Sequence, residues 1–198
     1  MRLQRLFKKE EISWAALALE VFSVTSSVLV ALAIGDWHER RQQQEQVEQA
    51  LRGIVAECES NRQVLEKRLE YYLALQTAVQ RKVEEQGADA PAFPIEGWDG
   101  LKPALLRDAS YRTAISTQAF SHMDMRVADA VAQVYSLQDL YRFYLDKTVD
   151  QMIMSRGFEN VGSLRMTMTE LIALTQETIN VERQLSTALQ KKVGSRKT

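Results

Sequence analysis

The sequence contains very little cysteine, histidine, proline and glycine. Its 198 residues include one Cys, two His, three Pro and eight Gly. The single cysteine, Cys58, excludes an intramolecular disulfide and a cysteine-based zinc site, and two histidines argue against a histidine-rich metal site. The scarcity of proline and glycine favours long regular elements. A net charge of −1 gives no general attraction to nucleic acid, while 45% hydrophobic residues indicate a folded core.

The most apolar stretch of the chain covers residues 12–34, where 17 of 23 residues are apolar. As a helix it would reach about 34 Å, which is enough to cross a hydrocarbon layer of about 30 Å. Trp14 and Trp37 stand near its two ends and predict an aromatic anchor at each membrane interface. The sequence therefore predicts a transmembrane helix over residues 12–35, preceded by a flank of residues 1–11.

The charges beside this stretch predict its orientation. Four basic residues precede it within the flank, namely Arg2, Arg5, Lys8 and Lys9, and fewer follow it closely. The positive-inside rule then places the flank in the cytoplasm and exports residues 36–198, to the periplasm in a Gram-negative bacterium. A cleaved signal peptide is the alternative, with residues 31–33 (Ala-Leu-Ala) as its cleavage site. Both interpretations place residues 36–198 outside the cytoplasm.

Small residues recur at every fourth position inside the apolar stretch, and a carboxyl group lies on the same arc. These residues form what we call the packing ridge: Glu20, Ser23, Ser27, Ala31 and Gly35. Small residues let a second helix approach closely, and a carboxyl at this depth is costly to expose to lipid. We therefore expect the ridge to pack against a second copy of the chain or another membrane protein. Two alternatives stay open: Glu20 is a protonated residue bonded to a nearby serine without function, or it conducts protons or ions.

The remainder of the chain follows helical periodicity and contains no strand pattern. Apolar residues recur in steps of three and four up to about residue 86, and Asn61 falls within this stripe, either fixing register or lying on a solvated flank. All three prolines fall in one loop, 87–103, whose Phe93 and Trp98 are expected to plug the end of a bundle. Further helices are predicted over 104–118, 122–156 and 163–192, with a capping box at residues 121–124. The predicted fold is all-α: one N-terminal transmembrane helix that continues into an antiparallel helical bundle.

No catalytic or metal-binding constellation is evident. Three Met-x-Met pairs contain the soft ligands that Cu(I) prefers, but positions two apart on a helix point about 200° apart and cannot chelate together. Ser110, which precedes His122, lacks a nucleophile elbow, and Glu57 and Glu59 are expected to point in different directions. We therefore expect neither an enzyme nor a cofactor.

Short motifs resemble a family of uncharacterised bacterial single-pass inner-membrane proteins. The first joins Glu20 to residues 28–32 (Val-Leu-Val-Ala-Leu) and residues 37–40 (Trp-His-Glu-Arg); the second is Glu57-x-x-x-Asn61. A third runs from Tyr111 through residue 123 and is followed by a helix with Tyr135. The resemblance implies the same topology and says nothing of a reaction. The function expected is that of a membrane-anchored interaction, scaffold or sensor-like protein; the alternative is a subunit of an ion- or proton-conducting complex.

Overall fold

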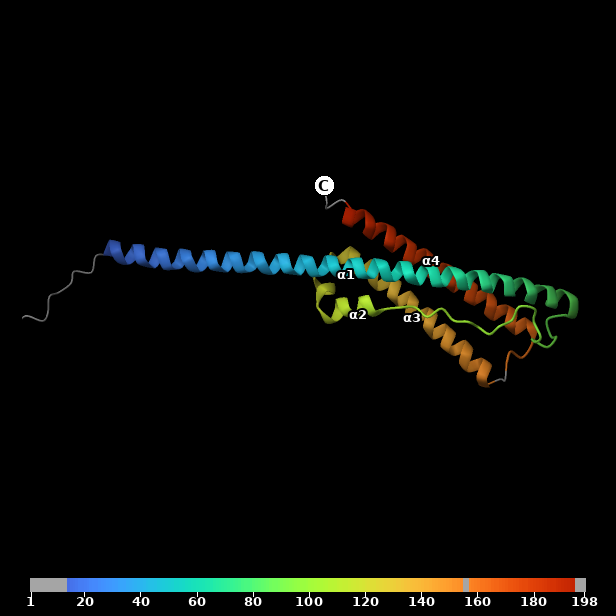
Figure 1. Cartoon of the computed structure of the whole chain (residues 1–198). Helices are drawn as coiled ribbons and strands as arrows, with labels where there is room; N and C mark the ends of the chain where they lie inside the picture. The colour runs from blue at the N-terminus through green and yellow to red at the C-terminus, as the bar shows by residue number, and fades with distance from the viewer. Residues whose placement is uncertain (1–13, 155–156, 195–198) are drawn as a thin grey trace, which may run out of the picture. The chain divides into compact units, whose positions relative to one another are not determined.

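The computed structural model of the chain describes residues 14–154 and 157–194, which are almost entirely helical. In order, the elements are α1 (Trp14–Gln86), α2 (Ala109–Ser116), the 3₁₀ helix η1 (Ala119–His122), α3 (Met125–Met154) and α4 (Val161–Gly194) (Figure 1). No strand occurs among these described residues. The predicted all-α fold is confirmed.

The chain divides into two compact units, Met1–Glu45 and Gln46–Thr198. In the first unit, the described residues belong to α1 alone. By length and composition, α1 is the one described helix that could cross a membrane, and none of its most apolar part is buried. The second unit contains the rest of α1 and all of the other elements.

The core of the second unit is built from one stripe of residues on each long helix. The spacing alternates between four and three, with one step of seven on α1, where Arg68 is only half-buried. This spacing keeps successive side chains on the same face of a helix, so the three stripes can meet. Every position below is buried. The core stripes consist of Leu51, Ile54, Cys58, Asn61, Leu65, Tyr72, Leu75 and Val79 on α1; Val127, Val131, Val134, Gln138, Tyr141, Leu145 and Thr148 on α3; and Leu164, Met168, Leu171, Thr175, Thr178, Glu182, Leu185 and Leu189 on α4.

Helix α4 runs antiparallel to both α1 and α3. As the residue number rises along α4, its partners move back along the other two helices. The pairs that establish this are Gln76–Thr169 and Glu66–Arg183 between α1 and α4, and Gln138–Glu182 and Tyr144–Glu170 between α3 and α4. Helices α1 and α3 consequently run in the same direction.

A short turn cannot connect α1 to α3, because the two helices run in the same direction. The chain therefore needs a long connection that leads from the end of α1 back along the bundle. Residues 87–108 provide it, and we call them the strap; Figure 1 shows the strap passing back along α1 before α2 begins. From Gln86 back to Glu57 is a rise of about 44 Å on an ideal helix, and 22 extended residues span at most about 70 Å. The predicted loop is thus the crossover that the helix directions require.

The strap is longer than predicted, because residues 104–108 have no regular secondary structure and are not helical. Their backbone groups bond to side chains of the long helices instead of to each other. Ala104 N–H donates to the Tyr141 hydroxyl at 3.4 Å, and both backbone groups of Arg107 bond to the Asn61 amide at 2.8 Å. These tertiary bonds replace the first turn of the predicted 104–118 helix, which shrinks to Ala109–Ser116.

The helix starts also differ from the prediction at two other points. Helix α3 begins at Met125 rather than 122, and its cap is Asp124, whose carboxylate accepts the Arg126 N–H at 3.1 Å. The predicted cap, Ser121, instead donates to the Gln118 carbonyl at 2.7 Å. Helix α4 begins two residues early, at Val161, behind an Asn160 cap, and it ends at Gly194 rather than 192. The predicted end of the preceding helix, at 156, lies outside the described residues.

Phe93 and Trp98 do plug one end of the bundle. Their ring centroids lie 4.9 Å apart, and each ring contacts Phe158 at 6.3–6.4 Å, in the turn before α4. All three pack against the core that the long helices share. The structure thus places both rings in the expected plugging position.

We predict that a fragment beginning at Gln42 folds by itself into a soluble and strongly helical domain. The reason is that the second unit holds both hydrophobic clusters of the chain. Circular dichroism of the purified fragment is the measurement. A helix content below roughly one third, the average of globular proteins, contradicts the prediction.

Candidate functional site

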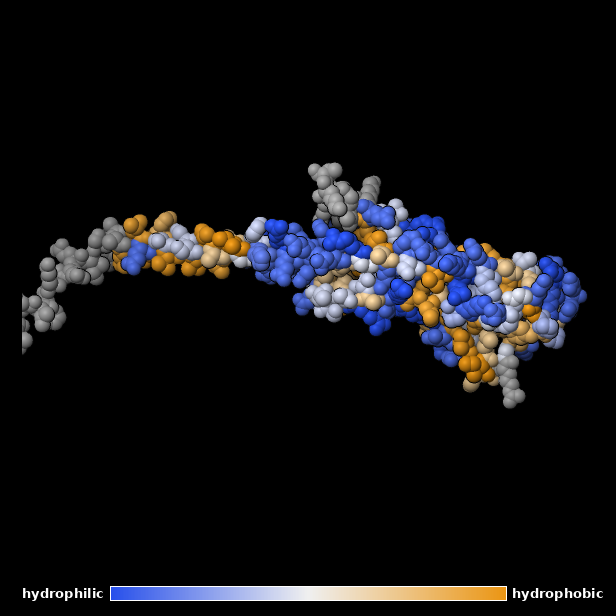
Figure 2. All heavy atoms as spheres, viewed as in Figure 1, coloured by the Kyte–Doolittle hydropathy of each residue, from blue (hydrophilic) through white to orange (hydrophobic). Residues whose placement is uncertain are grey.

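The apolar stretch of α1 presents its side chains outward on all sides. Ten large apolar residues are exposed there, with Leu19 at 69% and Phe22 at 70%; the others are Leu17, Val21, Val24, Val28, Leu29, Val30, Leu32 and Ile34. Figure 2 shows them as a hydrophobic band that gives way to polar residues further along the same helix. A surface this apolar is typical of a helix that meets lipid or another protein rather than water.

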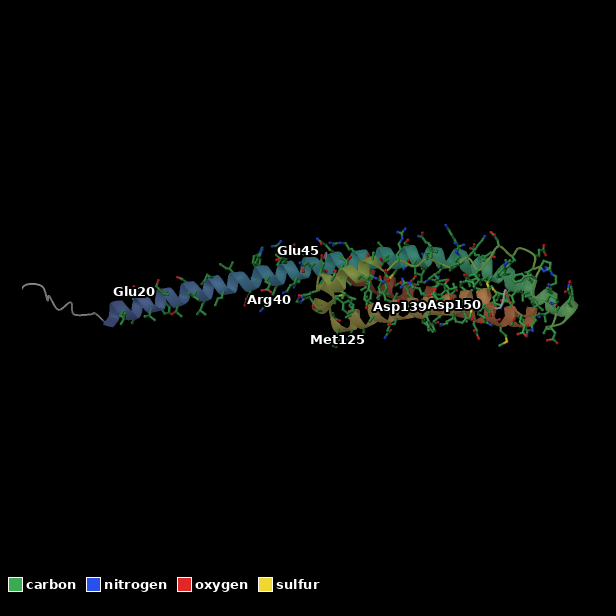
Figure 3. The ribbon with its side chains drawn as sticks, turned by 90° about the horizontal axis from the view of Figure 1, so that it is seen from below. Glu20, Arg40, Glu45, Met125, Asp139 and Asp150 are labelled. Carbon is green, nitrogen blue, oxygen red and sulfur yellow. The ribbon has the colours of Figure 1, made fainter. Side chains whose placement is uncertain are left out.

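The packing ridge lies on this helix, and all five of its residues are exposed. Glu20 is exposed and projects from the helix (Figure 3), and a Cβ added at Gly35 would meet nothing within 4 Å. The Ser27 hydroxyl donates to the Ser23 carbonyl one turn earlier, at 2.8 Å, and so uses its hydrogen-bonding capacity inside its own helix. Among the described residues, Glu20 has no hydrogen-bond partner, and no bond joins it to either serine.

The two predicted interface anchors are described to different extents. Trp14 is the first residue of α1, and its side chain lies outside the description. Trp37 is 61% exposed, and the Arg41 guanidinium lies 5.7 Å from the centre of its ring. An exposed tryptophan beside a basic residue is typical of a membrane interface.

A buried polar cluster in the second unit brings together residues that lie far apart in the sequence. The Glu57 carboxylate accepts the Tyr135 hydroxyl and the Ser110 N–H, the latter at 2.8 Å. Ser110 is in the first turn of α2, so Glu57 satisfies a backbone donor that the helix itself cannot. The ring of Tyr111 stacks on Tyr135 at 4.2 Å. Glu57 thus connects α1 to both α2 and α3.

Glu57, Asn61 and Gly53 occupy one row of α1, four residues apart, and dock the end of the strap. Asn61 is only 1% exposed, so the solvated-flank interpretation of this residue is wrong. Its amide holds Arg107 through both backbone groups. A Cβ at Gly53 would lie 3.2 Å from the Ser110 hydroxyl, so the absence of a side chain permits this close approach. Glu59, by contrast, faces solvent and pairs with Arg62, as its position beside Cys58 predicts.

Burial favours the neutral forms of three groups in this unit, namely Cys58, Tyr135 and Glu182. It raises the pKa of the Cys58 thiol to about 12, and it raises the pKa of the Tyr135 hydroxyl, to which the bond with Glu57 adds. Burial also raises the pKa of Glu182 to about 8. A nucleophilic cysteine requires a lowered pKa, so Cys58 acts as a packing residue in the core.

The described residues offer no group of three or more His, Cys, Asp or Glu that could hold a metal ion. Met166 and Met168 point in different directions, as their helical spacing predicts: Met168 is buried and Met166 is 64% exposed. Met123, which precedes α3, is buried, whereas Met125 is 78% exposed. Figure 3 labels Met125 at the start of α3. The two thioethers of such a pair therefore cannot bind one ion.

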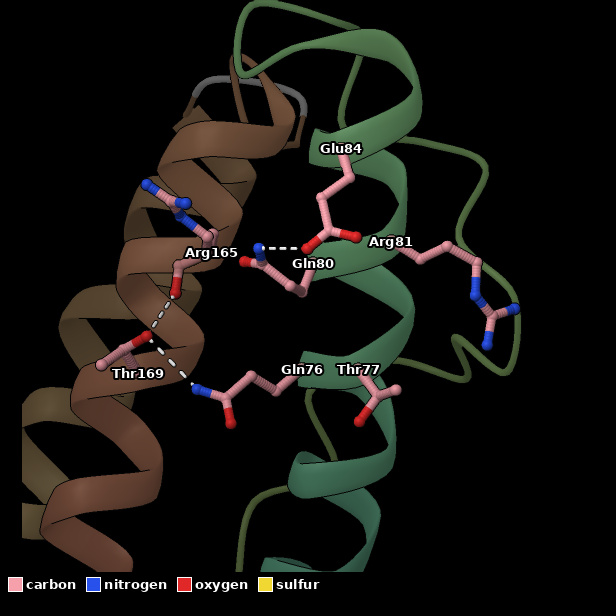
Figure 4. Close-up of a pocket in the computed structure, with 7 residues that line it drawn as sticks. All are labelled: Gln76, Thr77, Gln80, Arg81, Glu84, Arg165 and Thr169. Carbon is pink, nitrogen blue, oxygen red and sulfur yellow. Dashed lines mark hydrogen bonds between the residues drawn. The ribbon is translucent and has the colours of Figure 1, made fainter.

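A shallow polar groove runs between α1 and α4 (Figure 4). Its polar groups bond to one another: Gln76 donates to the Thr169 hydroxyl at 3.4 Å, and Gln80 donates to Glu84 at 2.8 Å. The remaining lining residues are Thr77, Arg81 and Arg165, and Arg81 turns away to pair with Glu96 at 3.2 Å. The groove presents no converging set of unpaired groups, and we assign no ligand to it.

Neither protein-family models, nor curated proteins, nor solved structures gave a match to this chain. The family resemblance therefore stays a prediction. Four of the residues quoted for it, Glu57, Asn61, Tyr111 and Tyr135, belong to the contacts described above. The sequence analysis did not predict that Gln138 and Glu182 are buried. The four-and-three spacing of α3 and α4 could have predicted it, because both residues fall on the buried stripes.

We predict that Asn61→Ala lowers the free energy of unfolding by about 1–3 kcal/mol, because it removes both bonds to the Arg107 backbone. The matched control is Arg107→Ala, which removes an exposed side chain and leaves those bonds intact, and which should change stability by less than about 0.5 kcal/mol. Urea unfolding of the full chain in detergent, followed by circular dichroism, measures both. Equal effects of the two substitutions would contradict the role of Asn61.

Proposed function

We propose that this chain is a membrane-anchored, non-enzymatic interaction protein, of the scaffold or sensor type, whose apolar helix crosses the bilayer and whose helical unit lies on the exported side. The observation that carries the proposal is the band of ten exposed apolar side chains on α1. Fully burying one such side chain is worth about 1.5–3 kcal/mol, so exposing the band to water would cost of the order of 10 kcal/mol or more. A bilayer removes that cost.

The flanking charges support the orientation, with Arg2, Arg5, Lys8 and Lys9 on the cytoplasmic side and Trp37 at the opposite interface. The non-enzymatic character is supported by Glu57 and Asn61, whose side chains are used in bonds to Tyr135 and to the backbone of Ser110 and Arg107. The packing ridge supports a partner within the membrane, either a second copy or another membrane protein. By the resemblance, the membrane would be the bacterial inner membrane and the exported compartment the periplasm.

Conduction of protons or ions is the second candidate function. It is favoured by one observation: Glu20 is an exposed carboxyl within an otherwise apolar stretch, without a partner among the described residues. Ionisable groups inside membranes commonly mark ion pathways. The two candidates differ in whether function requires Glu20 to ionise.

We predict that alkaline phosphatase fused after Thr198 is active and that green fluorescent protein fused there is dark. Alkaline phosphatase matures only outside the cytoplasm, and green fluorescent protein exported in the unfolded state does not fluoresce. Fusions made before Ile12 should behave in the opposite way. A fluorescent C-terminal fusion together with an inactive phosphatase would overturn the orientation.

We predict that replacing Ser27 and Ala31 with Leu weakens association of the apolar stretch more than Glu20→Gln does. Bulky residues on the ridge prevent close helix approach, whereas a polar contact inside a membrane averages only about 0.6 kcal/mol, or roughly threefold in affinity. A bacterial two-hybrid assay of the stretch measures association. The matched control is Val21→Leu with Leu29→Val, which changes two exposed aliphatic residues on the opposite side.

The outcomes separate the two candidates. Loss of association in the Ser27/Ala31 variant alone supports the interaction protein. Loss of function in Glu20→Gln with association intact supports conduction. If neither variant changes anything, the stretch is a simple anchor and both proposals for the ridge fail.

A further inference from the structure

Two buried polar side chains at the centre of the second unit each lack one hydrogen bond. Gln138 on α3 and Glu182 on α4 are both 0% exposed, and the Gln138 amide donates to Glu182 Oε1 at 2.8 Å. The remaining oxygens, Gln138 Oε1 and Glu182 Oε2, are buried and have no partner among the described residues. Both are acceptors when Glu182 is ionised, so neither can satisfy the other.

A single proton on Glu182 would satisfy both of these unpaired oxygens. A neutral carboxylic acid has an O–H donor, and a proton on Glu182 Oε2 supplies the donor that Gln138 Oε1 lacks. The acid and the amide would then face each other through two hydrogen bonds, one in each direction. An unpaired buried donor or acceptor costs about 1–3 kcal/mol, so the gain from the second bond is substantial.

The charges around Glu182 do not offer an ionised carboxylate a cation as a hydrogen-bond partner. The Arg62 guanidinium on α1 lowers the pKa of Glu182 but bonds to Glu59 and Glu66, and the neighbouring Arg183 also bonds to Glu66. Glu57 and Glu59 act in the opposite direction to Arg62, and burial dominates all of these effects. The groups that face Glu182 from the packed helices are Glu57, Cys58, Glu59 and Arg62 on α1, and Tyr135 and Gln138 on α3.

We propose that Glu182 is a proton-dependent switch: as a neutral acid paired with Gln138 it holds α4 to α3, and release of its proton to water loosens α4 from the bundle. This inference concerns the second unit alone and does not rest on the membrane anchor. Ionisation would leave a negative charge without a hydrogen-bonding cation at a site with no access to solvent, near the Glu57 carboxylate. Separation of α4 from α3 would hydrate that charge.

The direction of the pH effect follows from the raised pKa. The carboxyl titrates at about 8 in the folded chain, compared with an ordinary value of 4.5. Below pH 4.5 both states hold the proton, and the contribution to stability is complete. Between these values the folded state holds a proton that the unfolded state has lost, so stability falls as pH rises, and it levels off above about 8. The other buried groups, Cys58 and Tyr135, stay protonated throughout this range.

The test compares the wild type with Glu182→Gln, which keeps an amide capable of two bonds to Gln138 but cannot ionise. Urea unfolding of the full chain in detergent is measured from pH 4.5 to 9.5. Relative to the variant, the folding equilibrium constant of the wild type should fall by up to about tenfold per pH unit and become constant above about pH 8. The matched control is Glu177→Gln on the exposed side of α4, which should follow the wild type. Parallel pH profiles of wild type and Glu182→Gln overturn the proposal.

Infrared spectroscopy keeps the proposal testable even if Glu182→Gln does not fold. The Glu20→Gln chain, which lacks the carboxyl within the apolar stretch, should show the C=O stretch of a protonated carboxylic acid at pH 7, and the band should disappear as pH rises through about 8. A spectrum without this band at pH 7 shows that Glu182 is ionised in the folded chain and refutes the switch.

Discussion

The alternating spacing of four and three residues on three helices is the constraint on which the second unit depends. It places a residue in the core at each step whether that residue is apolar or not. Leu65 and Leu164 fill their positions by packing, whereas Asn61, Gln138 and Glu182 occupy equivalent positions and must find hydrogen bonds there. The polar interactions of the unit are thus consequences of the same periodicity that forms its hydrophobic core.

The directions of the three long helices explain the length of the strap. With α4 antiparallel to both other helices, α1 and α3 run in the same direction, so residues 87–108 must return along the bundle without a neighbouring strand. Buried backbone N–H and C=O groups without hydrogen bonds cost stability. Here side chains of the long helices supply the hydrogen bonds that a neighbouring strand would provide in a sheet. Asn61, Tyr71, Tyr72 and Tyr141 each bond to the strap backbone. These contacts hold in place a segment that has no regular secondary structure of its own.

The sequence predicted the helices and their buried faces because periodicity is local. Val131 and Leu171, for example, are buried as their spacing indicates. It did not predict that residues 104–108 are non-helical, because Asn61 and Tyr141, which bond to their backbone, lie more than 30 positions away. Gln138 and Glu182 were missed for a different reason. Both residues lie at positions where the four-and-three spacing expects a buried residue. A search for apolar residues alone leaves a gap at each of these positions. Following the spacing regardless of residue type would have predicted that both are buried.

Two glutamates in apolar surroundings illustrate opposite solutions to the same problem. Glu182 meets an amide from another helix of its own unit, so its interactions are internal and a single proton completes them. Glu20 has no partner among the described residues, and the small residues beside it leave room for a helix to approach. A carboxyl in hydrocarbon needs either a proton or a partner. Within the bundle, Gln138 meets this requirement for Glu182. For Glu20, we propose that a second helix packed on the packing ridge meets it.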